Sequence, residues 1–418
     1  MKFSVEVTDR AGLSAYVSRW KELAANAIER NAFYEPAMLL PGLESMPQAA
    51  PLFVFVFSLD PRSGAKGELR GFFPLERLRI HRLLPVPVLG LWEYGNCFLC
   101  TPLVHRTCPA QTLATFFDWL DEDPRSAPLF RLGLVTAEGA FHHHLLDFLR
   151  ARGSLAVSDV AYTRAYLRQR QTTQDYLQAA LTPDKRRDLD RKKRRLLSMG
   201  KLEFRMLDDP EDVETWIEDF LRLEASGWKG RAGTSLAQKG EGRTFFAPAV
   251  RQALRERMLL LQGLFLDDKP IAMRCSFVAG EGSFFFKPAY DEAYARFSPG
   301  VLLELETIRA VHDHPTVRWM DSCTSPDNEL LNKLWMDRRA IHSVTIATKR
   351  GTGQVVIAAL PMLRLLKRSV FRYTDRLGLA SKVYAGDAVA RRPGVTDADK
   401  PDAREHEAYD APRTRHAD

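Results

Sequence analysis

The sequence predicts an α/β protein of two similar halves, in which mixed β-sheets are flanked by helices. Strand-length runs of alternating apolar residues are interleaved with amphipathic stretches of ten or more residues, a pattern typical of α/β domains. The same order of elements occurs twice, with a period of about 165 residues that is far too long for a solenoid repeat. The chain of 418 residues is also long enough for two or three domains, each with its own core.

The first half, residues 1–170, begins with a short strand-like run and two helices, and then continues through three strands. A helix, a strand, a second helix and a final strand complete it. The predicted strands are 3–9, 50–60, 67–80, 86–99, 129–138 and 160–169, and the predicted helices are 13–27, 33–43, 112–123 and 141–153.

The second half, residues 171–350, repeats this plan with clearer signals. The predicted strands are 201–209, 258–268, 269–280, 281–290, 317–323 and 342–350, and the predicted helices are 211–228, 241–258, 301–313 and 328–335. Residues 351–385 read as a basic, amphipathic segment, most clearly over 361–372. Residues 386–418 lack apolar periodicity, and we expect this tail to be disordered.

A basic run at the start of the second half carries most of the excess charge of the chain, which is +7 overall. Residues 183–201 contain nine basic and three acidic side chains. Thr182 suits a helix N-cap, Pro183 the first helical position and Gly200 the residue just past the end, which predicts a helix over 183–199. Its charges are either a solvated face or a contact for the phosphates of an activated sugar, a lipid carrier or tRNA.

The cysteine spacing and the hydropathy of the chain indicate in which cellular compartment the protein is expected. Cys97 and Cys100 form a C-x-x-C, but no second pair at matching spacing exists, so we expect buried thiols and no metal site. No apolar run reaches the roughly 18–20 residues that a spanning helix needs. We therefore expect a cytoplasmic protein, with peripheral contact at the inner face of a membrane left open.

The segment 284–300 carries the clearest functional signal. Three phenylalanines run into a loop that ends in Ser298-Pro299-Gly300, where Ser298 can cap a helix and Gly300 lets another group approach the backbone. The start of a helix presents unpaired N–H groups and the positive end of the dipole, which suits a pyrophosphate, and Arg296 would add charge. The alternative is a capped helix with no ligand.

The amino-acid sequence of several segments resembles that of a known family. Leu223-Glu224, 227–230, Gly233-Thr234, Lys287, 289–291, Tyr294 and 298–300 resemble the CelD-like (cellulose-biosynthesis-associated) branch of the GNAT acyltransferases, which is related to the FemAB peptidyltransferases. The resemblance implies tandem GNAT (acyl-CoA N-acyltransferase) folds. It implies a degenerate first half, because the stretch 101–111 offers no glycine-bearing loop of the S-P-G type, and acetyl-CoA or another acyl-CoA as co-substrate.

The resemblance also suggests roles for individual residues. Residues of the loop and helix start would bind the cofactor, namely Arg296, Ser298, Gly300 and Val301. Acceptor contacts would come from Trp228, Lys229, Gly233, Thr234 and Tyr294, although Trp228 could instead be packed in the core.

Acyl transfer needs a base for the acceptor, polarisation of the thioester oxygen and a proton for the leaving thiolate. The catalytic candidates are Asp291 and Asp321 as acids or bases, with Lys287 and Tyr290 on the splayed strand. Tyr290 or Tyr294 could protonate the thiolate. The alternative for each aspartate is structural, with Asp291 capping the following turn and Asp321 capping the helix near Asp327.

Together these observations predict an acyltransferase that moves an acyl group, with acetyl the expected one, from acyl-CoA to an amine or hydroxyl of a polysaccharide precursor or a metabolite. Two alternatives remain: a FemAB-like transferase that uses aminoacyl-tRNA, and a non-catalytic accessory protein of exopolysaccharide or cellulose biosynthesis. An anionic membrane surface or another polyanion is a further expected partner of the basic segments. Nucleic acid is not expected, because no aromatic residue interleaves the basic run to stack on bases.

Overall fold

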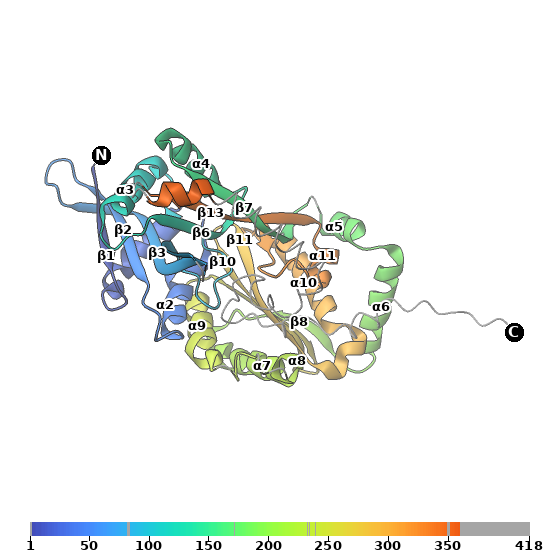
Figure 1. Cartoon of the computed structure of the whole chain (residues 1–418). Coiled ribbons are helices and arrows are strands. Elements are labelled where there is room, and N and C mark those ends of the chain that lie inside the picture. Colours follow the sequence, from blue (N-terminus) through green and yellow to red (C-terminus); the bar gives the residue numbers. More distant parts are fainter. Residues whose placement is uncertain are drawn as a thin grey trace.

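The computed structural model describes residues 2–81, 84–170, 172–231, 233, 235–238, 240–348 and 352–359, with the backbone alone for 79–81, 84, 85, 228 and 229. All the strands in this part of the chain belong to one 13-stranded mixed sheet (Figure 1). Along the sheet their order is β1-β2-β3-β4-β6-β13-β7-β12-β11-β10-β9-β8, and β5 pairs with β3. The strands are β1 (Lys2–Thr8), β2 (Leu52–Leu59), β3 (Lys66–His81), β4 (Leu84–Leu91), β5 (Leu103–Val104), β6 (Leu129–Thr136), β7 (Ala156–Arg168), β8 (Leu202–Met206), β9 (Leu259–Leu266), β10 (Lys269–Ala279), β11 (Gly282–Tyr290), β12 (Trp319–Asp321) and β13 (Asp337–Ala347).

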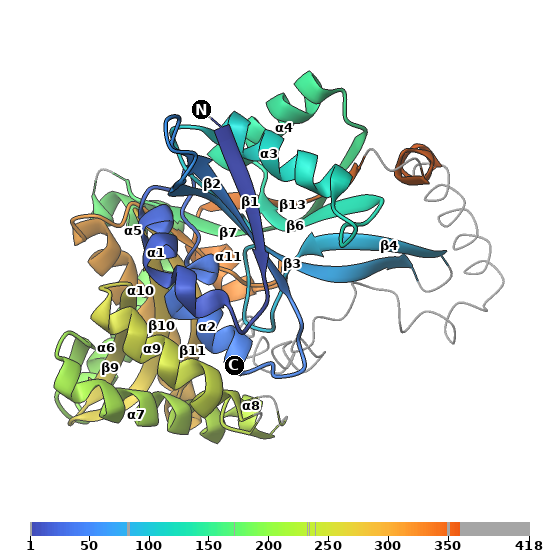
Figure 2. The ribbon, with the colours of Figure 1, turned by 90° about the vertical axis from the view of Figure 1, so that its left-hand side faces the viewer.

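Helices cover both faces of this sheet (Figures 1 and 2). The helices of the first half are α1 (Val17–Ala25), α2 (Pro36–Glu44), α3 (Pro109–Glu122) and α4 (Ala140–Arg152). Those that follow are α5 (Thr173–Ala180), α6 (Pro183–Leu197), α7 (Val213–Ser226), α8 (Trp228–Arg231), α9 (Ala247–Arg255), α10 (Pro299–Asp313) and α11 (Glu329–Leu334). In the second half, α7 and α9 share a core with α2 of the first half, whereas α10 packs on the opposite face in a separate cluster with α5 and α6.

The two halves repeat one strand pattern and exchange their last strands. In the first half β1 to β4 are antiparallel neighbours and β6 lies parallel to β4. In the second half β8 to β11 are antiparallel neighbours and β12 lies parallel to β11. However, β7 of the first half pairs with β12, and β13 of the second half pairs with β6. The predicted α/β class with mixed sheets and flanking helices is confirmed, and the sheet runs without a break across the predicted division at 170/171.

A buried ion network holds the exchanged strands together. Asp321 of β12 contacts Arg164 of β7 at 2.6 Å and Arg339 of β13 at 2.9 Å, and the side chains of Asp321 and Arg164 are fully buried. The guanidinium of Arg339 also lies 4.2 Å from the ring of Tyr166 and 4.4 Å from that of Trp319. Burial by itself raises the pKa of Asp321, but the two arginines outweigh it and hold this pKa below its usual range.

Most predicted elements are present with shifted ends, and some were missed. The strand predicted over 86–99 ends at Leu91, and a loop follows in which the Sγ atoms of Cys97 and Cys100 lie 3.6 Å apart, both buried as expected. The basic helix begins at Pro183 with Thr182 accepting from the Lys185 N–H, as predicted, but it ends at Leu197, two residues early. Helix α5 was missed.

The C-terminal predictions are tested only at their start. Residues 352–359 are helical, and Ile357 packs with Val88 and Leu129. The segment 361–372 and the tail 386–418 lie outside the described residues.

Candidate functional site

An open strand edge lies at the centre of the second half. Because β12 is only three residues long, its pairing with β11 stops at Phe284. Strand β11 continues to Tyr290, and in the described part of the chain residues 285–290 have a strand neighbour, β10, on one side only. On the other side, the backbone of residues 285–287 and 289 has no strand partner among the described residues, so a ligand that lies alongside the strand could pair with it.

A β-bulge sits at the start of this open edge. Phe285 pairs with Ser276 and Lys287 with Cys275, so Phe286 is an extra residue on β11. A bulge re-aims the side chains that follow it. Consequently Phe286 and Lys287 both face the α7 side of the sheet, where the Phe286 ring lies 6.1 Å from that of Phe246.

On the α7 side of the sheet, Lys287 lies close to the buried carboxylate of Glu224. The Nζ of Lys287 lies 3.9 Å from Oε1 of Glu224 on α7, with the lysine side chain 22% exposed and the glutamate side chain fully buried. The other oxygen of Glu224, Oε2, accepts a hydrogen bond of 2.9 Å from the N–H of Leu236. One oxygen of Glu224 thus binds the backbone at Leu236, which follows α8, and the other lies opposite Lys287 at the open edge of β11.

Glu224 was quoted for the resemblance but was not predicted as a site residue. A signal for it was present in the sequence. The apolar stripe of α7 includes Ile217, Phe220 and Leu223, and Glu224 falls on the same stripe, seven residues after Ile217 and four after Phe220. An acidic residue on the buried stripe of a helix needs a polar partner inside the protein.

The helix start of the S-P-G segment lies where the sequence predicts it, but Ser298 does not cap it. Ser298 occupies the N-cap position with a left-handed backbone (φ 54°, ψ 53°), and its side chain makes no capping hydrogen bond. In that conformation its hydroxyl points to another element, and it accepts from the Nζ of Lys192 on α6 at 3.0 Å. A Cβ built on Gly300 would meet no atom within 4 Å, so the approach to the first turn of α10 is open.

The contact between Lys192 and Ser298 brings the basic helix α6 beside the start of α10. No sequence pattern predicted this proximity, because the two residues lie 106 positions apart in the chain. Several basic side chains of α6 form salt bridges with nearby carboxylates. Arg187 pairs with Asp184, Lys192 with Asp188, and Lys193 with Glu306 of α10 at 2.8 Å.

The other predicted catalytic residues have structural partners. Asp291 accepts from the Ala293 N–H at 3.0 Å and pairs with Lys269 at 3.2 Å, so it caps the following turn. Asp321 is buried in the exchange network described above. Tyr290 is the last residue of β11 and is partly buried against the α10 cluster.

The remaining predicted ligand-binding residues are dispersed around the helix start. Arg296 is exposed, with its guanidinium 4.7 Å from the Phe297 ring, and Val301 has a buried side chain, which leaves only its N–H for a ligand. The Tyr294 ring lies 6.0 Å from the Nζ of Lys269.

Three residues predicted to contact the acceptor lie in or near α8. The backbone of Trp228 and Lys229 forms the start of α8, and Gly233, two residues after its end, has a φ of +70°. Thr234 lies outside the described residues.

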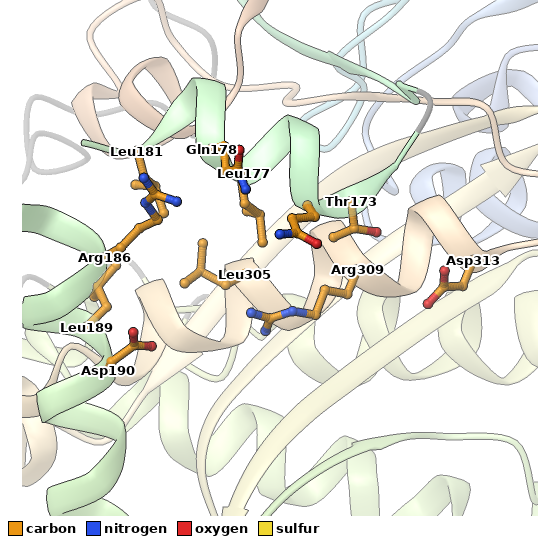
Figure 3. Close-up of a pocket in the computed structure, with 11 residues that line it drawn as sticks. Thr173, Leu177, Gln178, Leu181, Arg186, Leu189, Asp190, Leu305, Arg309 and Asp313 are labelled. Carbon is orange, nitrogen blue, oxygen red and sulfur yellow. The ribbon is translucent and has the colours of Figure 1, made fainter. Parts of the chain in front are cut away.

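Two cavities lie away from this constellation. One of about 470 Å³ opens to the surface and is lined by residues of α5, α6 and α10, with leucines between the arginine and aspartate side chains of its walls (Figure 3). It flanks the middle and end of α10 and includes none of the predicted site residues. The other, of about 440 Å³, lies in the first half beside Arg70 and His105. Within the described residues, no group of three or more histidine, cysteine or acidic side chains could hold a metal ion.

A family match covers the part of the chain that contains the open edge of β11 and the start of α10. Residues 183–329 match the family model described as Acetyltransferase (GNAT) domain. This segment is therefore similar to a GNAT acetyltransferase domain. No curated protein matches the chain.

Several solved structures are similar to the chain at low sequence identity. They include a conserved protein of unknown function from Bacteroides thetaiotaomicron, 12% identical, covering 80% of this chain and 97% of that chain, with a TM-score of 0.49. FemX is 11% identical, with 85% and 100% covered and a TM-score of 0.46. A tandem GNAT protein from the clavulanic acid biosynthesis pathway is 15% identical, with 82% and 98% covered and a TM-score of 0.37.

Proposed function

We propose that the protein is an acyltransferase that moves an acyl group from an acyl-CoA thioester to an amine or hydroxyl. The observation that carries the proposal is the bulged, open edge of β11, which leads to the accessible start of α10. This arrangement lies inside the segment 183–329 that matches the GNAT domain. Acyl-CoA has a long arm with amide groups and ends in phosphates, so it matches an open strand edge followed by a helix N-terminus.

The donor phosphates are assigned to the first turn of α10. The N–H groups of Gly300 and Val301 lie in this turn, where backbone donors lack an intrahelical partner and the helix dipole favours an anion. Lys192 is held at this turn by its hydrogen bond to Ser298, and Arg296 lies just before it. The open space at Gly300 is consistent with a phosphate at this position.

Three side chains at the open edge are assigned chemical roles. Lys287 polarises the thioester oxygen as negative charge develops on it. Glu224 acts through Lys287 as a positioning residue, because its buried carboxylate lies 3.9 Å from the ammonium and attracts it to this side of β11. Tyr290 gives a proton to the departing thiolate and recovers one, through solvent, from the acceptor. Asp291 and Asp321 receive no chemical role, because their carboxylates already bind Lys269, Arg164 and Arg339.

The proposed acceptor is a polysaccharide precursor or a small metabolite. Support for this acceptor class comes from the resemblance of the second half to CelD-like sequences, at Leu223-Glu224 and the glycine-rich stretch 227–234. Glu224 fastens Leu236 just after that stretch, so the segment is held beside the open edge where an acceptor would approach.

Ligand-dependent stability tests the proposal. CoA at about 100 times its dissociation constant should stabilise the protein by about 2.7 kcal/mol, and aminoacylated tRNA should not. Acetyl-CoA with pooled amines and sugar nucleotides should then release free thiol.

The matched variants are Gly300→Val, which fills the approach to the helix start, and Gly133→Val on β6 of the first half, where an added Cβ would meet only Oε2 of Glu93 at 3.8 Å. Loss of the CoA effect in the first variant alone is expected. A folded Gly300→Val protein with unchanged CoA affinity would refute the assigned donor site.

A further inference from the structure

The outer face of α6 combines unpaired cations with exposed apolar side chains. Among the described residues, Arg194 and Arg195 have no acidic partner, and the Arg194 side chain donates only a long hydrogen bond of 3.4 Å to the Asp190 carbonyl. Leu197, three residues after Arg194, is 50% exposed, and Met199 is 45% exposed. Residues three apart are neighbours on a helix surface, so Arg194 and Leu197 form one patch.

The fold does not use this patch. The buried side of α6 is made by Leu189 and Leu196, which pack in the cluster beneath α10. Arg194, Arg195, Leu197 and Met199 are all exposed, and both views place α6 at the margin of the molecule (Figures 1 and 2).

The chemistry of the patch favours one kind of partner. Nucleic acid would use the cations, but it gains nothing from exposed leucine and methionine, and no aromatic residue in 183–201 could stack on bases. At an anionic bilayer, arginines contact lipid phosphates while neighbouring apolar tips enter the boundary between headgroups and acyl chains. We propose that the outer face of α6 and the turn that follows it, through Arg194, Arg195, Leu197 and Met199, dock on an anionic lipid surface.

The contact is peripheral. Within the described part of the chain, no helix is both long and apolar enough to cross a membrane. Helix α6 also supplies Lys192 to the start of α10, so the proposed donor site adjoins the helix that docks. This inference does not depend on acyl transfer, because vesicle binding and CoA binding are measured separately.

Co-sedimentation of the full chain with vesicles tests the proposal. The wild-type protein should bind phosphatidylcholine vesicles that contain phosphatidylglycerol, bind pure phosphatidylcholine vesicles weakly, and lose binding as salt is raised. Arg194→Gln with Arg195→Gln should weaken partitioning about 25-fold, since each cation near an anionic surface is worth about fivefold. Leu197→Ser with Met199→Ser should weaken it roughly tenfold.

The controls remove the same groups elsewhere. Arg62→Gln with Arg150→Gln removes two exposed charges in the first half, and Val160→Ser removes an exposed apolar side chain on β7. These variants should bind like wild type, and all variants should keep the wild-type circular dichroism and CoA affinity.

Several results would overturn the proposal. They are absence of binding to anionic vesicles, equal binding to neutral ones, and an unchanged affinity in the Leu197/Met199 variant. Binding of polyuridylic acid that depends on Arg194 and Arg195, with no vesicle binding, would assign the face to a polyanion instead.

Discussion

Replacement of Asp321 by asparagine separates a structural from a chemical role for this residue. Asp321→Asn keeps the shape of the side chain and the oxygen that accepts from the Cys323 N–H at 3.0 Å, but removes the charge between Arg164 and Arg339. Arg164 is fully buried, so its charge would lose its counterion without access to water. Removal of one partner from a buried pair costs about 3–5 kcal/mol.

The free energy of unfolding is measured by urea denaturation, followed by circular dichroism at pH 7. Asp291→Asn is the matched control: it keeps the cap and loses only the partly exposed pair with Lys269, which is worth about 0–1 kcal/mol. If Asp321→Asn alone prevents folding, Arg164→Met in the same chain should restore part of the stability, because no unpaired buried charge then remains at Arg164.

The pH dependence gives a second measure. The pKa of Asp321 is lowered in the folded protein, so its stabilisation is present above its unfolded pKa of about 3.9 and is lost as pH falls through the folded value. Asp321→Asn should therefore flatten the decline of stability below about pH 4. A variant that loses less than about 1 kcal/mol but loses turnover would refute the structural role and return Asp321 to the catalytic candidates.

Three further predictions address the proposed site. Lys287→Met should lower kcat by roughly 10²–10⁴-fold with little change in CoA affinity, measured by thiol release, while Lys201→Met, just before the distant edge strand β8, leaves kcat unchanged; equal losses would remove Lys287 from the chemistry. Lys192→Ala should weaken CoA binding by about 1–2 kcal/mol in calorimetry and leave kcat at saturation unaltered, whereas unchanged affinity would mean that Lys192 only bonds Ser298. Calorimetry should give one CoA per chain, because the first half lacks an S-P-G loop, and two equivalent sites would contradict this.

Local sequence patterns were sufficient for most helices and strands. Strand β9 and helix α7 follow from apolar periodicity, which depends only on neighbouring residues, and the start of α6 follows from Thr182 and Pro183. The repeated order of elements also predicted the α/β class. The end of β4 was missed because the apolar residues that follow Leu91 are buried in a loop, and burial without strand pairing leaves the same pattern.

The position of the candidate site was predicted in part. Lys287 and the start of α10 were found because a strand, a loop and an S-P-G helix start are consecutive in the chain. The partner of Lys287 was not found, because Glu224 lies 63 residues earlier and reaches it only when α7 packs on the sheet. The contact between Lys192 and Ser298 was missed for the same reason.

The amino-acid sequence alone therefore determined the elements, their order, the duplicated plan and the accessible helix start, since each depends on residues close together in the chain. Packing determined the exchange of β7 and β13 between the halves, the burial of Asp321 between two arginines, and the bulge that turns Lys287 toward Glu224. These features join residues from distant segments. Strand partners are chosen by the burial and hydrogen bonding of the whole sheet, a choice that no local pattern encodes.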